Sequence, residues 1–413
     1  MRAFWIVVII LLYTAPISAQ TLEDCLDCHS KKTPGIVSDW KLSKHSENGV
    51  GCNVCHGTGH SGMKDIDKVR IPTPEVCAKC HPTQVSQFTL GKHSMAWAAS
   101  SAMPTAHAQP VAMMSGMKGC NGCHKIGLKT EADIRKLKEE GQDYGLASCD
   151  ACHTRHTFSK KEAQQPQACQ TCHMGYDHPQ WEMYSSSKHG VRALLRQNGT
   201  LSSEISGPTC QDCHMSKGNH EVRTAWGFYG IRLPLPENEQ WASDRTTILR
   251  ALGVIDQEGK GTPRLDVLRT ADVMRLTQDA WQIERDRMVR ACSNCHSTKF
   301  AEGELKKGDD MIREADRMMA KAILIVASLY GDGLLPKPMN YAYDFPDLLT
   351  FHDAPTAIET RLSSMFFKHR GRTFQGTFHM NPDHALWQGW SEMVEDLTAI
   401  KTMSDDYRYK SKK

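Results

Sequence analysis

The N-terminal pattern is a single short apolar run. Residues 4–12 are apolar, Arg2 precedes them, and small residues lead up to Ala19. A basic start, a short apolar run and small residues at its end predict a secretory signal peptide over residues 1–19. Without cleavage, the same run would act as a membrane anchor. No later stretch approaches about eighteen consecutive apolar residues, so we expect the mature protein to be soluble.

The rest of the chain shows two patterns. Residues 20–242 contain few alternating, strand-like runs and predict short helices joined by loops. Residues 243–413 place apolar side chains at helical spacing and predict long helices over residues 265–292, 309–330 and 384–403. A proline-rich turn separates the two regions. The sequence therefore predicts a mainly α fold.

Composition adds a constraint on the interior of the N-terminal region. The chain is long enough for two or three ordinary domains, but only 40% of its residues are hydrophobic. That fraction is low for burying so much core, so something other than side chains must fill the interior. The formal net charge of +3 gives no sign of a nucleic-acid-binding surface.

The cysteines form one repeated motif. All sixteen occur in Cys-x-x-Cys pairs, and a histidine directly follows each pair. This spacing lets two thiols bond the two vinyl groups of one porphyrin while the adjacent imidazole ligates its iron, so each motif predicts a covalent c-type haem. A zinc site or a disulfide framework would not require a histidine after every pair. In chain order, the eight motifs are Cys25, Cys28 and His29; Cys52, Cys55 and His56; Cys77, Cys80 and His81; Cys120, Cys123 and His124; Cys149, Cys152 and His153; Cys169, Cys172 and His173; Cys210, Cys213 and His214; and Cys292, Cys295 and His296.

Eight haem c groups change the expected architecture. Each porphyrin is a large apolar plate, so short helices and loops can wrap a stack of haems where apolar side chains are too few. Haems at this density must lie within electron-transfer distance of one another. Covalent haem attachment takes place outside the cytoplasm, which agrees with an exported, periplasmic protein. A basic run at Lys368, Arg370 and Arg372 either meets haem propionates or faces solvent.

Most of the irons are expected to have a second histidine ligand. Of the 20 histidines in the chain, twelve remain after the eight of the motifs. Seven distal ligands for eight irons would leave one iron open. The spare histidines are His107, His352, His369 and His384, and a methionine could also ligate one haem. The seven predicted distal ligands are His45, His60, His93, His156, His189, His220 and His379.

These motifs and their surroundings resemble the octahaem hydroxylamine oxidoreductase family over about residues 22–401. All eight motifs end in histidine, which argues against the pentahaem nitrite reductases, whose catalytic haem has a lysine as its proximal ligand. The most specific segments are residues 172–183 (CHMGYDHPQWEM), 187–190 (SKHG), 152–156 (CHTRH), 224–228 (TAWGF) and 378–383 (FHMNPD).

The resemblance implies a catalytic site at the fourth haem, whose proximal ligand is His124. It implies that Asp177 and His178 project onto the open face of that haem. A histidine oriented by a carboxylate can deliver protons near neutral pH. The same dipeptide could instead be an ordinary helix start with a capping aspartate. The resemblance also implies a tyrosine in the pocket, for which Tyr229 is the candidate.

A departure from the family bears on the direction of the reaction. In oxidising members, a tyrosine from the C-terminal part of a neighbouring subunit bonds covalently to the catalytic porphyrin. Here no tyrosine occurs between Asp344 and Asp406, and His384 stands where family members often show tyrosine. The cross-link is therefore expected to be missing. Members without it are expected to work reductively, on nitrite or hydroxylamine, towards ammonium.

Three functions follow as hypotheses. The first is a periplasmic reductase of nitrite, hydroxylamine or both, in which seven bis-histidine haems feed one five-coordinate haem. It would take electrons from a partner cytochrome or a quinol-linked membrane cytochrome, and the resemblance implies a homotrimer formed through the long C-terminal helices. The second is a hydroxylamine or hydrazine dehydrogenase, which would need a cross-linking tyrosine from Tyr341, Tyr343, Tyr407 or Tyr409, or from a partner. The third is an electron carrier in which all eight irons have six ligands.

Overall fold

The computed structural model describes ten stretches of the chain. They are residues 21–102, 110–114, 119–141, 148–227, 229–233, 235–270, 274, 276–336, 345–349 and 354–413. The predicted signal peptide, residues 1–19, lies outside the described residues.

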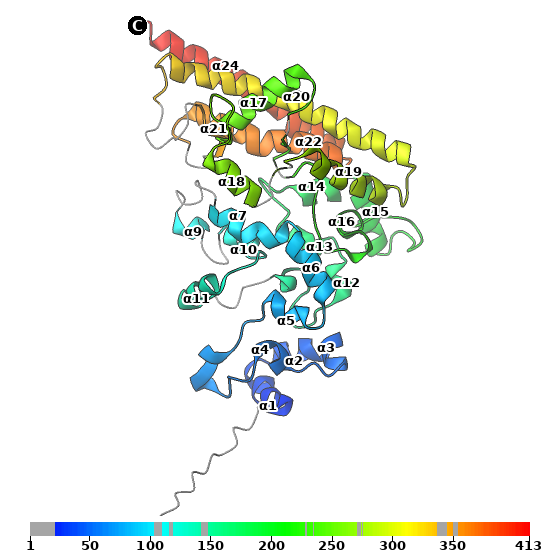
Figure 1. The fold of residues 1–413 in the computed structure, drawn as a ribbon. Helices are drawn as coiled ribbons and strands as arrows, with labels where there is room; N and C mark the ends of the chain where they lie inside the picture. The colour runs from blue at the N-terminus through cyan, green and yellow to red at the C-terminus, as the bar shows by residue number, and fades with distance from the viewer. Residues whose placement is uncertain are drawn as a thin grey trace, which may run out of the picture. The chain divides into compact units, whose positions relative to one another are not determined.

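The described chain is mainly α-helical, which confirms the predicted fold class (Figure 1). Within the described stretches, the β pairing consists of one isolated bridge between Ile255 and Gly261. The chain divides into two compact units. One comprises the residues up to Pro72 together with Arg155–Phe158, and the other comprises Thr73–Thr154 together with Ser159–Lys413. The predicted organisation into a haem-rich region 20–242 and a helical region 243–413 stays a prediction.

The helices are short in the N-terminal part of the chain and longer towards the C-terminus. The first unit contains α1 (Leu22–Lys32), α2 (Pro34–Lys41), α3 (Lys44–Glu47), α4 (Cys52–His56) and the 3-10 helix η1 (Met63–Lys68). The second unit begins with α5 (Pro74–Ala78), α6 (Pro82–Leu90), η2 (His93–Met95), α7 (Ala96–Ala102), α9 (Val111–Met114), α10 (Asn121–His124), α11 (Glu131–Glu139), η4 (Cys149–Ala151), α12 (Lys160–Ala163), α13 (Gln167–Gln170), α14 (Gln180–Ser185), α15 (Lys188–Gln197), α16 (Cys210–His214) and η5 (Ser216–Gly218). It continues with α17 (Glu239–Ala251), α18 (Pro263–Thr270), α19 (Gln278–Cys292), α20 (Thr298–Gly331), α21 (Ala357–Ser364), the π-helix η7 (Met365–Arg370), α22 (Gly371–Phe378), α23 (Pro382–Ala385), the π-helix η8 (Leu386–Ser391) and α24 (Glu392–Lys410).

Several short helices are built from the haem motifs themselves. α4, α10 and α16 each contain residues of a motif, and none of them has a buried residue. α16 begins at a capping box, in which the backbone N–H of Thr209 donates to the Asp212 carboxylate at 2.7 Å. Such a cap can start a helix of a single turn without an apolar face packed against other helices. These elements therefore suit packing against haems rather than against one another.

The helix predicted over residues 309–330 is longer than its periodicity indicates. α20 begins at Thr298, where the Ser297 side chain accepts from the backbone N–H of Phe300 at 3.3 Å, and it ends at Gly331 as predicted. Its first turns carry few apolar residues among many charged ones, which weakens the pattern there, although Ala301 and Leu305 are buried. The helix predicted over 384–403 is observed as α23, η8 and α24 in succession and continues to Lys410.

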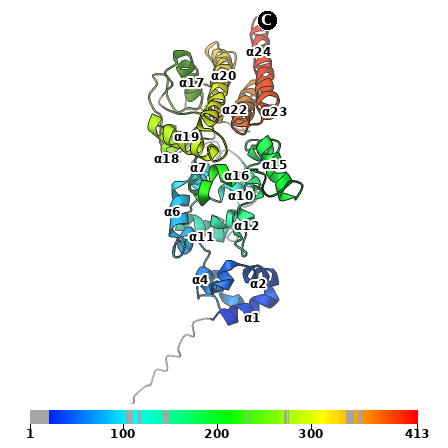
Figure 2. The ribbon, with the colours of Figure 1, turned by 90° about the vertical axis from the view of Figure 1, so that its right-hand side faces the viewer.

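The C-terminal helices form the apolar core of the second unit. α17, α22 and α24 pack along α20 (Figures 1 and 2). Ile248 of α17, Ile323 of α20 and Ile400 of α24 belong to one buried cluster. Within the described residues, both clusters of buried apolar side chains draw their buried members from Trp226 onward. This placement agrees with the expectation that haems fill the interior of the preceding region.

A buried ionic network joins three of these helices. Asp316 of α20 accepts from Arg245 of α17 at 2.8 Å and from Arg370 of η7 at 2.6 Å, and all three side chains are at most 1% exposed. Arg370 also donates to the backbone carbonyl of Tyr229, and Arg245 donates to that of Gly230 at 3.0 Å. The network thereby fixes the backbone of residues 229–230. The expectation that Arg370 meets a propionate or solvent is wrong, because Asp316 gives it a buried partner.

None of the helices in the described stretches is both long and apolar enough to cross a membrane.

Candidate haem and catalytic site

All sixteen motif thiols are free of disulfide bonds, and none of the cysteines is buried. They are therefore accessible for attachment to a cofactor, and a disulfide framework is absent. The described residues also contain no group of three or more His, Cys, Asp and Glu side chains that could hold a metal ion among themselves. A structural zinc site would require such a group.

Four motifs have their second cysteine at or near the surface: the first, second, third and eighth. These residues are Cys28, Cys55, Cys80 and Cys295, of which Cys55 is half-buried and the others are exposed. Cys295 Sγ lies 3.8 Å from the Ser206 hydroxyl, and the backbone carbonyl of Cys55 accepts from Arg70 Nε at 2.9 Å. Neither contact identifies a haem, so the attachment of haem at these four thiols stays a prediction that rests on the spacing of the motifs.

Predicted distal histidines lie opposite motif histidines in six pairs. Each pair joins residues from different parts of the sequence, with ring centroids 6.0 to 6.4 Å apart. The six pairs are His29–His60 at 6.2 Å, His56–His156 at 6.1 Å, His173–His93 at 6.0 Å, His153–His220 at 6.2 Å, His296–His189 at 6.1 Å and His214–His379 at 6.4 Å.

This spacing is what two imidazoles need to ligate one iron from opposite sides. Two metal–nitrogen bonds of about 2 Å, with each ring centre about 1 Å beyond its nitrogen, separate the two ring centres by about 6 Å. The paired histidines therefore fit a haem iron held by two imidazoles.

Hydrogen bonds at Nδ1 orient several of these rings. His124 Nδ1 lies 3.1 Å from the carbonyl oxygen of Ala96, and His379 Nδ1 lies 2.8 Å from that of Gln375. A partner at Nδ1 fixes the tautomer and leaves Nε2 for a metal. At His60, the partner of Nδ1 is instead a carboxylate oxygen of Asp65, 3.1 Å away.

Asp65 is held strongly as a carboxylate. The Ser61 hydroxyl donates to it at 2.7 Å, and the backbone N–H groups of Ser61 and Gly62 donate at 3.0 and 2.8 Å. These hydrogen bonds, with the Ser61 hydroxyl contributing most, hold the pKa of Asp65 well below its usual value.

Motifs that are separate in sequence lie beside one another. The third motif contacts the fifth, and the sixth contacts both the fourth and the seventh. Haems attached at these positions would be close neighbours, as electron transfer between them requires. The contacts are between the thiols of Cys77 and Cys149, of Cys123 and Cys172, and of Cys169 and Cys210.

The fourth motif faces a histidine–carboxylate couple. The ring centroids of His124 and His178 are 6.4 Å apart, with the ring planes at 82°. His178 Nδ1 lies 3.1 Å from Asp177 Oδ1, and the two side chains are 29% and 47% exposed. Burial raises the pKa of Asp177, but the hydrogen bond and the positive charge of His178 outweigh it and bring the pKa below its usual value.

Helix capping does not account for this couple. α14 begins at Gln180, directly after Pro179, and has no side-chain cap. The distance between His124 and His178 matches that of the paired ligands, so ring spacing alone assigns no role to His178. Its ring is also 6.1 Å from that of His173. His178 is set apart by the contact of its Nδ1 with the adjacent Asp177 carboxylate and by its closeness to two motif histidines.

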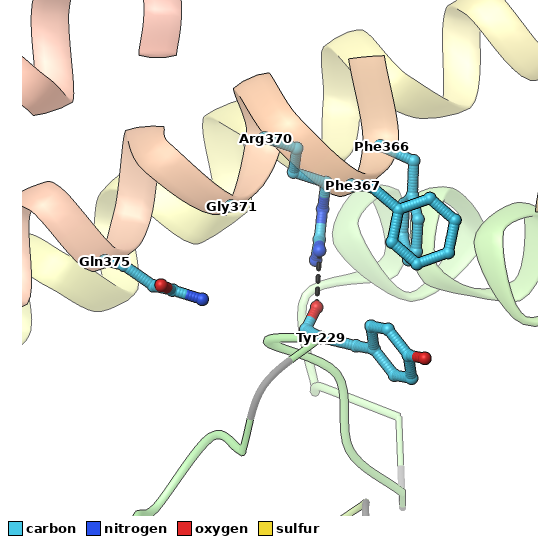
Figure 3. A pocket seen from close by; sticks show the side chains of 6 residues that line it. All are labelled: Tyr229, Phe366, Phe367, Arg370, Gly371 and Gln375. Carbon is cyan, nitrogen blue, oxygen red and sulfur yellow. Dashed lines mark hydrogen bonds between the residues drawn. The ribbon is translucent and has the colours of Figure 1, made fainter. Parts of the chain in front are cut away.

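Tyr229 lies near the same carboxylate. Its ring packs on Phe366 and Phe367, with centroids 5.8 and 6.0 Å away. Burial raises the pKa of its phenol, and the negative charge of Asp177 raises it further, so the hydroxyl stays protonated and can donate a hydrogen bond. Figure 3 shows the small cavity beside it, lined by Tyr229, Phe366, Phe367, Arg370, Gly371 and Gln375.

Two glutamines support this arrangement, and the motif pattern did not indicate them. Gln180 Oε1 lies 3.3 Å from Nδ1 of His173, and Gln180 Nε2 donates to Gln375 Oε1 at 2.9 Å. The backbone carbonyl of Gln375 is in turn the partner of His379. The pair therefore joins a ligand of the sixth motif to a predicted ligand at the seventh. Gln180 lies within the segment that resembles the family most strongly, but nothing in the sequence pairs it with Gln375.

The other candidate histidines fall into three groups. His45 and His81 belong to different units of the chain. His107 and His352 lie outside the described residues. The spare histidines His369 and His384 are buried among the C-terminal helices, where His369 Nδ1 lies 2.5 Å from Asp396 Oδ2.

Comparison with family descriptions gives two matches. Residues 48–248 and 267–340 match the family described as "Seven times multi-haem cytochrome CxxCH". Residues 13–57 match "Cytochrome c554 and c-prime".

Curated relatives are longer than this chain. A probable nitrite reductase-hydroxylamine oxidoreductase fusion protein of Kuenenia stuttgartiensis is 26% identical over 94% of this chain and 52% of its own length. The C-type polyheme cytochrome OmcB of Geobacter sulfurreducens is 29% identical over 34% of this chain and 21% of its own length. The chain therefore spans about half or less of the length of the curated relatives it matches.

Solved structures share the fold over nearly the whole chain. A chain of the Kuenenia stuttgartiensis reducing HAO-like protein complex Kustc0457/Kustc0458 matches with a TM-score of 0.71 and 25% identity, covering 94% of this chain and 86% of that chain. A hypothetical multiheme protein matches with a TM-score of 0.69 and 21% identity, covering 96% of this chain and 98% of that chain. The second likeness shows the fold alone.

Proposed function

The chain belongs to the multihaem cytochrome CxxCH family, as a hydroxylamine-oxidoreductase-like member with covalently bound haem c, and from this premise we propose that it reduces nitrite, hydroxylamine or both to ammonium. The observation that carries the proposal is the Asp177–His178 couple beside His124. The Nδ1 contact with Asp177 and the closeness to a second motif histidine, His173, suit His178 to donating protons at the fourth haem.

Eight haem c groups are held by the eight motifs in this proposal. The six histidine pairs at 6.0 to 6.4 Å support two imidazole ligands on six irons. His45 stays the seventh predicted distal ligand. Cys120, Cys123 and His124 would hold the haem that binds the substrate, and the seven other haems would relay electrons to it.

Three side chains beside the fourth haem would supply protons to the substrate and orient it. A haem held by the fourth motif would supply a binding site for a small nitrogenous molecule and a source of single electrons. His178 can donate a proton to a bound substrate, while Asp177 orients the ring through its contact with Nδ1. Tyr229 keeps its hydroxyl proton next to the same carboxylate and can hydrogen-bond an oxygen atom of the substrate.

Two of the four tyrosines that the oxidative alternative would need for a porphyrin cross-link lie on α24. Tyr407 packs against the core of the C-terminal helices, and Tyr409 is 60% exposed near the end of α24. Tyr341 and Tyr343 lie outside the described residues. The solved relative is described as a reducing complex, which favours the reductive direction, whereas the name of the fusion protein includes both activities.

The remaining parts of the proposal concern location and partners. The protein works in the periplasm, directed there by residues 1–19, and takes electrons from a partner cytochrome or a quinol-linked membrane cytochrome. It assembles as a homotrimer through its long C-terminal helices.

A turnover assay in both directions tests this function. With reduced viologen as donor, we expect the purified haem-loaded protein to consume nitrite or hydroxylamine and to form ammonium. With oxidised cytochrome c as acceptor, we expect little or no oxidation of hydroxylamine or hydrazine. Turnover confined to the oxidative assay would make the protein a dehydrogenase, and no turnover in either would leave an electron carrier.

A further inference from the structure

A carboxylate lies beside the predicted distal ligand of the first haem motif. His29 and His60 face each other at 6.2 Å, and His60 Nδ1 lies 3.1 Å from Asp65 Oδ1. Asp65 is only 19% exposed, and its carboxylate is fixed by three donors from Ser61 and Gly62. Its carboxylate therefore stays directed at His60 rather than turning into solvent.

The described Nδ1 partners of the other proposed ligands are neutral. They are a hydroxyl, a side-chain amide oxygen or a backbone carbonyl, which accept a hydrogen bond without carrying a full charge. A carboxylate acceptor draws the Nδ1 proton more strongly and makes the imidazole a more basic ligand. The neutral partners are the Thr33 hydroxyl for His29, the Gln180 amide for His173, and the carbonyls of Arg70 for His56, Ala96 for His124, Gly218 for His220 and Gln375 for His379.

We propose that Asp65 is a positioning residue that gives His60 anionic character and so lowers the reduction potential of the first-motif haem. A more electron-rich axial ligand favours ferric over ferrous iron, and hydrogen bonds to ligands are one of the means by which proteins set haem potentials. The inference rests on the proposed function in taking His29 and His60 as the two ligands of one relay haem.

A spectroelectrochemical titration of the haem-loaded protein tests this inference. Asp65→Asn keeps one acceptor oxygen and removes the charge. We expect one of the one-electron steps to move to higher potential by at least a tenfold change in its ferric–ferrous equilibrium, which is about 59 mV for one electron. Asp67→Asn is the matched control, because Asp67 is exposed on the same short helix η1 and has no described contact with either ligand. We expect it to change every step by less than twofold.

Two further variants identify which reduction step belongs to the first-motif haem and guard against misfolding of a single variant. Thr33→Val removes the neutral partner of His29 and should move the same step upward by less than Asp65→Asn does. Ser61→Ala removes a donor to Asp65, leaves more negative charge facing His60, and should move that step downward. The inference is overturned if Asp65→Asn and Asp67→Asn behave alike, or if Ser61→Ala raises the potential. The titration uses no nitrogenous substrate, so its failure is distinct from a failure of the proposed reductase activity.

Discussion

The variant His178→Ala is expected to lower kcat for viologen-driven nitrite reduction by about 10²- to 10⁴-fold, the usual contribution of a positioned general acid. His178 is the proposed proton donor, and its Nδ1 lies 3.1 Å from Asp177. Without the ring, protons must arrive through water that nothing orients. Asp177→Asn is expected to give a smaller loss, because the imidazole remains and only its orientation and charge stabilisation weaken.

Steady-state kinetics on protein of equal haem content measure this effect. Tyr176→Phe is the control, because Tyr176 is exposed in the same segment and its hydroxyl contacts only Ser364, at 3.2 Å, among the described hydrogen bonds. It should retain the activity of the unmodified protein. If His178→Ala kept full turnover while its haem spectrum was unchanged, the proton-donor role would be wrong.

The variant Asp316→Ala is expected to lower the free energy of unfolding by about 3–5 kcal/mol, the range found when one member of a buried ion pair is removed. Its carboxylate is the acceptor for both Arg245 and Arg370 and also accepts from the indole N–H of Trp241 at 2.8 Å. Removing it leaves two buried guanidinium groups without a counter-charge. Because Arg370 also holds the backbone carbonyl of Tyr229, the loss should loosen that residue as well.

Guanidinium unfolding followed by far-ultraviolet circular dichroism measures the change in the helical C-terminal region. Asp310→Ala is the matched control on the same helix, because Asp310 is half-exposed and pairs only with Lys306 at 2.8 Å. A surface pair of this kind should contribute about 0–1 kcal/mol. Equal unfolding midpoints for the two variants would show that the buried network contributes nothing beyond a surface pair.

The sequence predicts best the features whose residues are adjacent in the chain. A haem attachment site lies within five consecutive residues, so each of the eight motifs identifies its two cysteines and its histidine directly. The choice of the seven distal candidates also follows from local context. Their pairing does not, because partners such as His214 and His379 are brought together only by the fold.

Charge networks show the same limit. Arg370 could be identified from the sequence only as part of a basic run, since its partner Asp316 lies on another helix and nothing in the spacing joins them. The contact of Asp65 with His60 was accessible in principle, because Asp65 lies only five residues after His60 and three to four residues after the glycine and serine that donate to it. The start of α20 was obscured for a different reason, since the charged residues of its first turns hide the apolar positions.

The central claim is that the haem held by His124 has one position open to substrate, beside the Asp177–His178 couple. The spin state of its iron tests this claim most directly. Electron paramagnetic resonance of the oxidised protein should show one high-spin ferric haem among low-spin ones, and carbon monoxide should bind one haem of the reduced protein. Both signals should be unchanged in His178→Ala. A protein whose haems are all low-spin and do not bind carbon monoxide, or one in which the high-spin signal arises only after His178 is removed, would contradict the account.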